Sequence, residues 1–241
     1  MLDDIRFNEY YAKAFRDNIH TLTEVQLALY QTAFKFLAVS GLVASAFAAE
    51  YAIDPAHSEI IFKVRHLGIS TVTGRFDVFS GSFNLDPKNI GATKGSATIE
   101  VKTVNTNNAK RDEHLRSDDF FNAEKFPQIK FVSKAVKNVN NADTTSELVG
   151  DLTIRDITKE VTLKVKGTGL LANDGWGNER AAFKATGSIN RFEYNLKWTK
   201  LLESGGLVAA DKVDLELSFE GVHPLAPPAA AEKKVEKKAK K

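Results

Sequence analysis

The chain has 241 residues, of which 43% are apolar and 27% are charged, and its formal charge at pH 7 is +2. This composition is ordinary for a folded globular protein and excludes an intrinsically disordered one. The chain contains no cysteine, which excludes disulfides, thiolate nucleophiles and thiolate metal sites. The length allows one substantial domain or two small ones.

An apolar run, FLAVSGLVASA, occupies residues 36–46. It is shorter than the roughly 20 apolar residues that cross a bilayer, and the following Ala46-Phe47-Ala48 matches the small-x-small pattern that a signal peptidase accepts. We predict that residues 35–48 hold the apolar part and cleavage site of an export signal. Residues 1–34 then form a leader extension of unassigned role. The alternative is a short amphipathic helix before an uncleaved anchor.

From residue 51 to 222, apolar and polar residues alternate with a period of two, which is typical of strands with one buried face. The pattern predicts about eight or nine antiparallel strands. Helical periodicity is scarce. The stretch ELVGDLTIRDITKEVTLKVKG predicts a hairpin with its turn at residues 156–159, and Asn173-Asp174-Gly175 predicts another turn.

Strands with one buried face and no covering helices must close on themselves, so we expect an up-and-down barrel or a two-sheet sandwich over residues 49–222. Small residues at inward positions, such as Ala97, Gly150 and Gly187, alternate with phenylalanines. They either leave room for an apolar cavity or fit against the aromatic rings in a solid core. In the first case the cavity wall consists of Phe62, Val64, Phe83, Ile99, Val101, Phe131, Leu152, Ile154, Leu163, Phe183, Ala185, Leu215 and Leu217.

No motif in the sequence specifies a reaction. The five histidines show no spacing typical of metal ligands, no nucleophile elbow is present, and the Gly-rich segment at 204–206 lacks the lysine of a phosphate loop. We therefore predict no catalytic residues and no metal site.

The charged stretch RDEHLRSDDFF, residues 111–121, predicts a short helix or an ordered crossover near 111–122. It either caps one end of the barrel, with its charges paired, or forms a polar gate at the mouth. In the second case Arg111, His114 and Arg116 would meet the head group of a ligand.

Residues 223–241 form a Pro/Ala linker and a tail, EKKVEKKAKK, with six lysines and two glutamates. Because this tail holds more positive charge than the whole chain, the rest of the protein is slightly acidic, which argues against binding nucleic acid. We predict a disordered tail. Attraction of the tail to anionic lipid, as a peripheral membrane contact, is the alternative.

Five stretches in order resemble the signatures of the YceI-like, polyisoprenoid-binding family. They are DPAHSEIIFKVRHLGISTVTGRF, RDEHLRSDDFF, FPQIKF, GDLTIRDITKEVTL and the SIN-R of SINRFEYNL. The resemblance implies an all-β, antiparallel, lipocalin-like barrel of about eight strands. It also implies binding, transport or storage of a long polyisoprenoid or isoprenoid quinone precursor in the periplasm, or as a secreted protein, with that lipid as the bound group.

The chain departs from the family pattern after SIN-R. Members often have Asp-Phe-Gly where this chain has Glu193-Tyr194-Asn195, and a glycine is common near Ala210. These changes would reshape a loop beside the opening. An enzyme that acts on a bound isoprenoid through the His114 region is the alternative function, and a homodimer is an alternative to a monomer.

Overall fold

The computed structural model describes residues 49–202 and 206–225, which form a β-barrel with one short α-helix. The strands are β1 (Ala49–Ile53), β2 (Glu59–His66), β3 (Ser70–Phe76), β4 (Phe79–Leu85), β5 (Lys94–Glu100), β6 (Val104–Asn105), β7 (Gln128–Asn140), β8 (Thr145–Ile154), β9 (Ile157–Leu171), β10 (Asn178–Asn190) and β11 (Ala209–Pro224). The helix is α3 (Ala109–Arg116). The expected leader, signal and lysine-rich tail lie outside the described residues.

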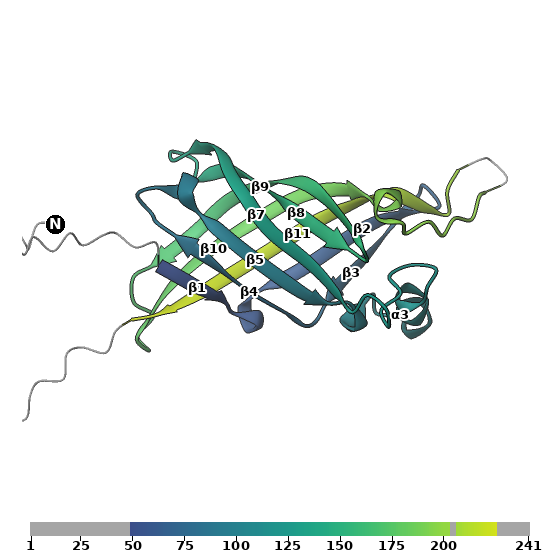
Figure 1. The fold of residues 1–241 in the computed structure, drawn as a ribbon, viewed down its shortest axis with the longest axis horizontal. Coiled ribbons are helices and arrows are strands. Elements are labelled where there is room, and N and C mark those ends of the chain that lie inside the picture. Colours follow the sequence, from purple (N-terminus) through teal and green to yellow (C-terminus); the bar gives the residue numbers. More distant parts are fainter. Residues whose placement is uncertain (1–48, 203–205, 226–241) are drawn as a thin grey trace, which may run out of the picture. The chain divides into compact units, whose positions relative to one another are not determined.

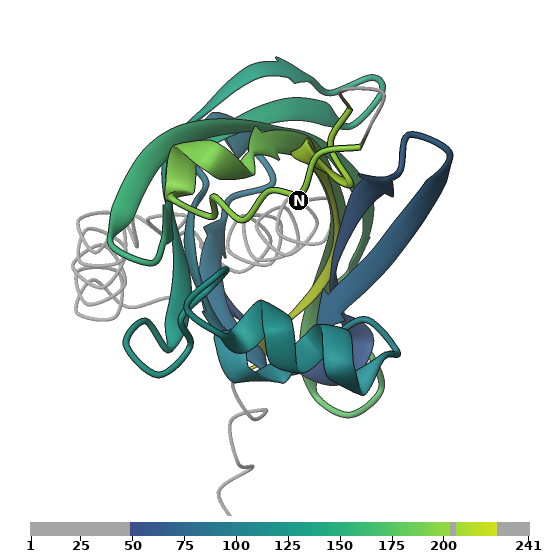
Figure 2. The same cartoon turned by 90° about the vertical axis from the view of Figure 1, so that its right-hand side faces the viewer.

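Eight antiparallel strands close the barrel, in the order β1, β4, β5, β7, β8, β9, β10, β11 and back to β1. The sequence-based prediction of a lipocalin-like barrel is confirmed, and the sandwich is excluded. The end-on view shows the ring, with α3 lying across one end of it (Figure 2). In the described part of the chain, no helix is long and apolar enough to cross a membrane.

Closure depends on the longest strand, β11, which pairs with two successive strands on one side. Its first half pairs with β2 and its last residues pair with β1. A 3₁₀ turn, Pro55–His57, separates β1 from β2, and Asp54 caps this turn by accepting a hydrogen bond from the Ala56 N–H (3.0 Å). Because β1 and β2 are separate strands, β1 can pair with β4 while β2 pairs with β3.

The turn between β8 and β9 differs from the prediction. The strands are joined by Arg155 and Asp156, not by residues 156–159, and Ile154 pairs directly with Ile157. Arg155 has φ +57°, which a two-residue hairpin turn needs. The period-two pattern placed the apolar faces of both strands correctly, but it carries no information on which residue adopts the left-handed conformation.

The inward glycines do not widen the interior. A Cβ on Gly150 would overlap the ring of Phe131 and lie 2.7 Å from the carbonyl oxygen of Val132. A Cβ on Gly187 would lie 2.7 Å from Leu163 Cδ2. Larger side chains of the neighbouring strands lie on these glycines. The expectation that the glycines fit against large side chains is therefore correct.

Gly150→Ala is therefore expected to lower the free energy of unfolding by about 1–3 kcal/mol, because the backbone of Val132 cannot yield as a side chain would. Urea unfolding at pH 7 measures this change. Gly169→Ala is the matched control, since a Cβ there meets nothing within 4 Å. Equal stability of the two variants would show that the barrel accommodates the Gly150 methyl group.

Candidate functional site

The interior of the barrel contains an apolar cavity of about 940 Å³. Every strand of the closed ring contributes to its wall, as do β2 and β3. The volume lies near the upper end of the roughly 300–1,000 Å³ of ordinary ligand pockets. Of the two alternatives predicted for the barrel interior, an apolar cavity and a solid core, the structure shows the cavity.

Twelve of the thirteen residues predicted to line this space lie on the cavity wall. They are Phe62, Val64, Phe83, Ile99, Phe131, Leu152, Ile154, Leu163, Phe183, Ala185, Leu215 and Leu217. Contact of these residues with a lipid stays a prediction.

Val101 does not line the cavity, so its placement by the alternation of β5 is wrong. The strand ends at Glu100, and Val101 begins a 3₁₀ turn, Val101–Thr103, in which alternation no longer holds. The Val101 N–H bonds to the carbonyl of Pro127 (2.9 Å), and the side chain is 1% exposed within the buried apolar cluster. Val101 therefore belongs to the solid part of the core.

The stretch around residues 111–121 forms the α3 end of the barrel, as a helix followed by tight turns. The Asn108 side chain caps α3 by accepting a hydrogen bond from the Arg111 N–H (3.1 Å). Arg111 donates from Nε to Thr106 Oγ1 (2.7 Å) and from Nη2 to the Thr106 carbonyl (2.8 Å). Buried Asp112 accepts from the Thr106 N–H (2.8 Å). These bonds hold α3 against β6 and place Arg111 on the cavity wall.

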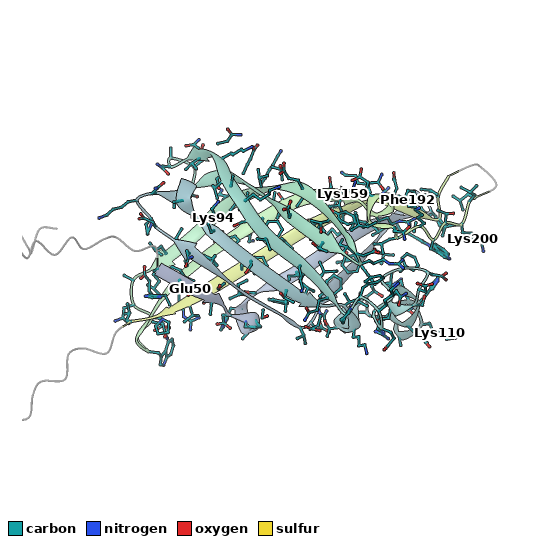
Figure 3. The ribbon with its side chains drawn as sticks, viewed as in Figure 1. Glu50, Lys94, Lys110, Lys159, Phe192 and Lys200 are labelled. Atoms are coloured by element: carbon teal, nitrogen blue, oxygen red, sulfur yellow. The ribbon has the colours of Figure 1, made fainter. Side chains whose placement is uncertain are left out.

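His114 also lies on the cavity wall, and its Nε2 lies 2.8 Å from Asp119 Oδ2. Its ring packs edge-on against Phe120 and Trp198. Arg116 lies elsewhere, beside a small surface hollow with Lys102 and Ser117, so the structure brings together only two of the three predicted head-group residues. At helical spacing, Arg116 faces away from the wall that Arg111 and His114 share. Figure 3 marks the α3 end of the barrel by Lys110, Phe192 and Lys200.

Sequence reasoning missed two arginines that build this end. Arg191 is 3% exposed and donates to the carbonyls of Leu196 (2.6 Å), Trp198 (2.9 Å) and Ala209 (3.0 Å). Burial lowers the pKa of Arg191, although the charge of Asp211 opposes this effect. Arg155 donates to the carbonyls of Phe120 and Asn195, both at 3.1 Å. The signal was present in the sequence, because both arginines stand in the quoted motifs.

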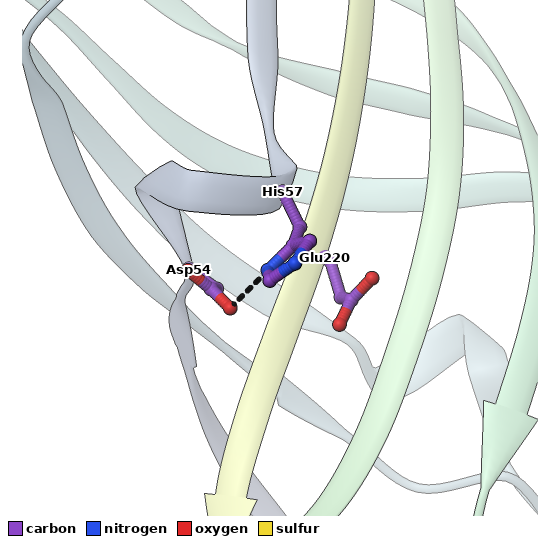
Figure 4. Close-up of side chains that lie close together, drawn as sticks. All are labelled: Asp54, His57 and Glu220. Atoms are coloured by element: carbon purple, nitrogen blue, oxygen red, sulfur yellow. Dashed lines mark hydrogen bonds and ion pairs between the residues drawn. The ribbon is translucent and has the colours of Figure 1, made fainter.

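Asp54, His57 and Glu220 converge at the junction of β1, β2 and β11, in the manner of three metal ligands (Figure 4). His57 Nδ1 lies 2.8 Å from Asp54 Oδ2. Both carboxylates are already paired with Arg180, whose Nη1 lies 3.2 Å from Asp54 and 2.5 Å from Glu220. A divalent cation would have to compete with this guanidinium. The group therefore acts as a polar clamp on the strand junction.

A sequence model of the YceI-like domain matches residues 51–221, which is most of the chain. This chain belongs to the YceI-like family. Its match to a UPF0312 protein of Yersinia enterocolitica is 45% identical over 180 residues and covers 74% of this chain and 88% of the relative. Its match to Protein YceI of Escherichia coli is 42% identical over 180 residues and covers 74% and 89% of the two chains.

Solved structures share the YceI-like fold. A Campylobacter jejuni YCEI protein, 30% identical, superposes with a TM-score of 0.57 over 67% of this chain and 90% of its own. A polyisoprenoid binding domain from Saccharophagus degradans superposes with a TM-score of 0.54 over 74% of this chain and 99% of its own. At 17% identity, the second likeness concerns the fold alone.

Arg180 pairs with Asp174 as well as with Asp54 and Glu220, and this additional pair predicts a dependence of stability on pH. Hydrogen bonds from Arg180 (2.8 Å) and Asn178 (3.0 Å) hold the pKa of Asp174 well below its usual value, despite the opposing effect of burial. A carboxyl whose pKa is lowered in the folded state stabilises the fold above its unfolded pKa, about 3.9, and loses this contribution as the pH falls through the folded value.

Asp174→Asn should therefore destabilise the barrel at pH 7, and the difference from wild type should shrink as the pH is lowered below about 4. Urea unfolding of both proteins at several pH values measures this difference. Asp143→Asn, in the exposed β7–β8 turn, is the control and should have little effect. A wild-type advantage that does not change with pH would contradict the role given to the Asp174 charge.

Proposed function

We propose that this protein binds one long apolar lipid chain, of the polyisoprenoid type, inside the barrel. The single observation that carries the proposal is the apolar cavity of about 940 Å³, which extends from Arg111 and His114 at the α3 end to Leu170 at the other. Burial of apolar ligand surface contributes about 25 cal/mol per Å². An elongated chain fits the shape of such a wall better than a compact ligand does.

The relatives support the class of ligand. The Saccharophagus degradans domain that shares the fold is described as polyisoprenoid binding. In this chain the wall offers aromatic and branched aliphatic side chains along its whole length, which match the methyl-branched repeat of an isoprenoid. We take binding, followed by transport or storage, as the function, and an isoprenoid quinone precursor as one ligand that fits.

We also propose that the protein works in the periplasm or as a secreted protein. The support is the apolar run at residues 36–46 and the small-x-small site that follows it. N-terminal sequencing of the exported protein should find a start at Ala49. A mature protein that begins near residue 1 would contradict export by this signal.

Native mass spectrometry of protein purified without detergent should show a mass increment from a bound apolar chain. Ala185→Leu should reduce the bound fraction several-fold, because Ala185 lies on the cavity wall and is 1% exposed. Lys184→Leu is the matched control, since Lys184 precedes it on β10 and is exposed on the outer face.

The two variants separate a ligand cavity from a core that simply tolerates substitution. If Ala185→Leu unfolds more easily but keeps its lipid, the added side chain has strained the wall without entering the ligand site. A wild-type protein that carries no lipid and takes up no added polyprenol would contradict the proposed function.

We place the polar end of the lipid at the α3 end, near His114. His114→Phe keeps a ring between Phe120 and Trp198 but removes both nitrogen atoms. It should weaken binding of a polyprenol by about threefold to tenfold, which corresponds to one hydrogen bond, and leave binding of a hydrocarbon without a hydroxyl group unchanged. Competition with a fluorescent lipid measures both affinities.

Arg116→Met is the control for this experiment, because Arg116 lies on the same helix but off the cavity wall. Equal effects of His114→Phe on both ligands would place the head group elsewhere.

The His114–Asp119 pair also favours a second function, because a carboxylate that orients a histidine is an arrangement found in general bases. Conversion of bound lipid by wild type but not by His114→Phe would establish that enzyme.

A further inference from the structure

The turn between β9 and β10 holds Trp176 out in solvent, with 84% of the residue exposed. A tryptophan gains more than most residues by leaving water, so a free-standing one usually has a partner. With so much of it exposed, the Trp176 side chain contributes little to the packing of the described barrel.

The exposed tryptophan is held in place by hydrogen bonds. Asp174 Oδ1 accepts from the N–H groups of Trp176 (2.8 Å) and Asn178 (3.1 Å), and its Oδ2 accepts from Arg180 Nε (2.8 Å). The Asp174 side chain is 2% exposed, and its charge is matched by Arg180. The turn therefore presents Trp176 on a braced support, which lowers the entropy cost of docking.

Apolar residues continue from the turn to the end of the cavity. Leu170 and Leu171, at the end of β9, are 50% and 52% exposed. Leu170 also belongs to the cavity wall, and Leu171 pairs with Arg180 beside the turn. Together with Trp176 they form what we call the tryptophan end of the barrel.

The chain leaves the described fold at this same place. Pro224, the last residue of β11, pairs with Asn178, and the Leu225 N–H bonds to the carbonyl of Gly177 (2.9 Å). The β11 strand ends beside the β9–β10 turn at the left of Figure 1. The segment that follows, residues 226–241, has six lysines and two glutamates. A strongly cationic segment is thus joined to the fold at the neighbour of the exposed tryptophan.

We propose that the tryptophan end docks on an anionic lipid bilayer. Tryptophan prefers the interface between the head groups and the hydrocarbon, where its ring is buried and its N–H remains hydrated. Lysines near an anionic surface contribute about 1 kcal/mol each at low ionic strength. The Leu225 to Gly177 hydrogen bond places the point where the lysine-rich segment joins the fold beside Trp176, so both contributions can act on one bilayer.

The docking end and the His114 end are opposite ends of the barrel. His114 packs on Trp198, which Arg191 joins to Ala209, the first residue of β11. The last residue of β11, Pro224, pairs with Asn178 beside Trp176. A lipid with its polar end near His114 would therefore direct its apolar end toward the bilayer, where any chain too long for the cavity would stay in hydrocarbon. Docking itself does not depend on what the cavity holds.

The opposite end of the barrel supplies a matched control. Ile69, in the turn between β2 and β3, is 81% exposed, close to the value of Trp176. It lies beside the start of β11, at the opposite end of that strand from Pro224, after which the lysine-rich segment follows. If exposed apolar surface alone drove membrane binding, Ile69 would matter as much as Trp176.

The test is cosedimentation of the full chain with vesicles of phosphatidylcholine containing about 30% phosphatidylglycerol, and with vesicles of phosphatidylcholine alone. Trp176→Ser should weaken binding to the anionic vesicles about tenfold. Replacement of the six tail lysines by glutamine should weaken it about a thousandfold or more, and added salt should weaken wild-type binding. Ile69→Ser should bind as wild type does. All variants share residues 1–48, so differences between them report the substituted positions.

The proposal is overturned if Trp176→Ser binds as wild type does, or if Ile69→Ser loses as much binding as Trp176→Ser. It is also overturned if the protein binds neither kind of vesicle and elutes from size-exclusion chromatography as a dimer that Trp176→Ser dissociates. The tryptophan end would then join two copies of the chain. Lipid occupancy in native mass spectra should be unchanged in Trp176→Ser, which keeps this test separate from the lipid-binding function.

Discussion

Closure of the barrel through β11 is the constraint on which the other features depend. Strands with one dry face expose unpaired N–H and C=O groups at the edges of an open sheet, and closure removes those edges. Here β11 pairs with β10 from Lys212 to Pro224, and on its other side it pairs with β2 and then β1. The turn at Pro55–His57 makes this change of partner possible, and the Arg180 clamp holds it.

Closure also explains why the interior is hollow despite its large side chains. The glycines sit under larger side chains of the adjacent strands, such as Gly150 under Phe131, and several aromatic rings contact each other. Phe183, for example, packs edge-on against Phe83 at 5.3 Å and tilted against Phe219 at 5.6 Å between ring centroids. Phe83 on β4 and Phe183 on β10 are separated in the ring by β1 and β11, so their contact bridges part of the interior, and the cavity runs past these rings. An apolar chain that filled this space would regain the dispersion contacts that the wall otherwise lacks.

The sequence predicted the wall well because its signal is local. Alternation reports which face of a strand is buried, and twelve residues on the cavity wall follow from it. It failed where the backbone leaves the strand conformation, at Val101 in a 3₁₀ turn and at Arg155 in a tight hairpin. It also could not show that Gly150 lies beneath Phe131, because this contact depends on the pairing register of two strands.

The α3 end was the hardest part to predict, because its order comes from contacts distant in sequence. Arg155 reaches carbonyls of residues 120 and 195, and Arg191 reaches those of residues 196, 198 and 209. Asn195, which stands where the family pattern has glycine, has φ +61°, a conformation that asparagine tolerates better than most residues. Asn195 thus supplies the left-handed residue that ends the 3₁₀ turn Arg191–Tyr194.

Arg191 bonds to the backbone carbonyls named above, and Arg155 bonds both to backbone carbonyls and to the Asp118 carboxylate (3.2 Å). A guanidinium held in this way keeps its positive charge close to the wall while its hydrogen-bonding capacity is largely used. The α3 end consequently offers a cationic environment to a polar or anionic head group, with His114 as the side chain that can still change its hydrogen bonds. The charged motif thus builds the end of the barrel and puts Arg111 and His114 on the wall where the proposed head group would lie.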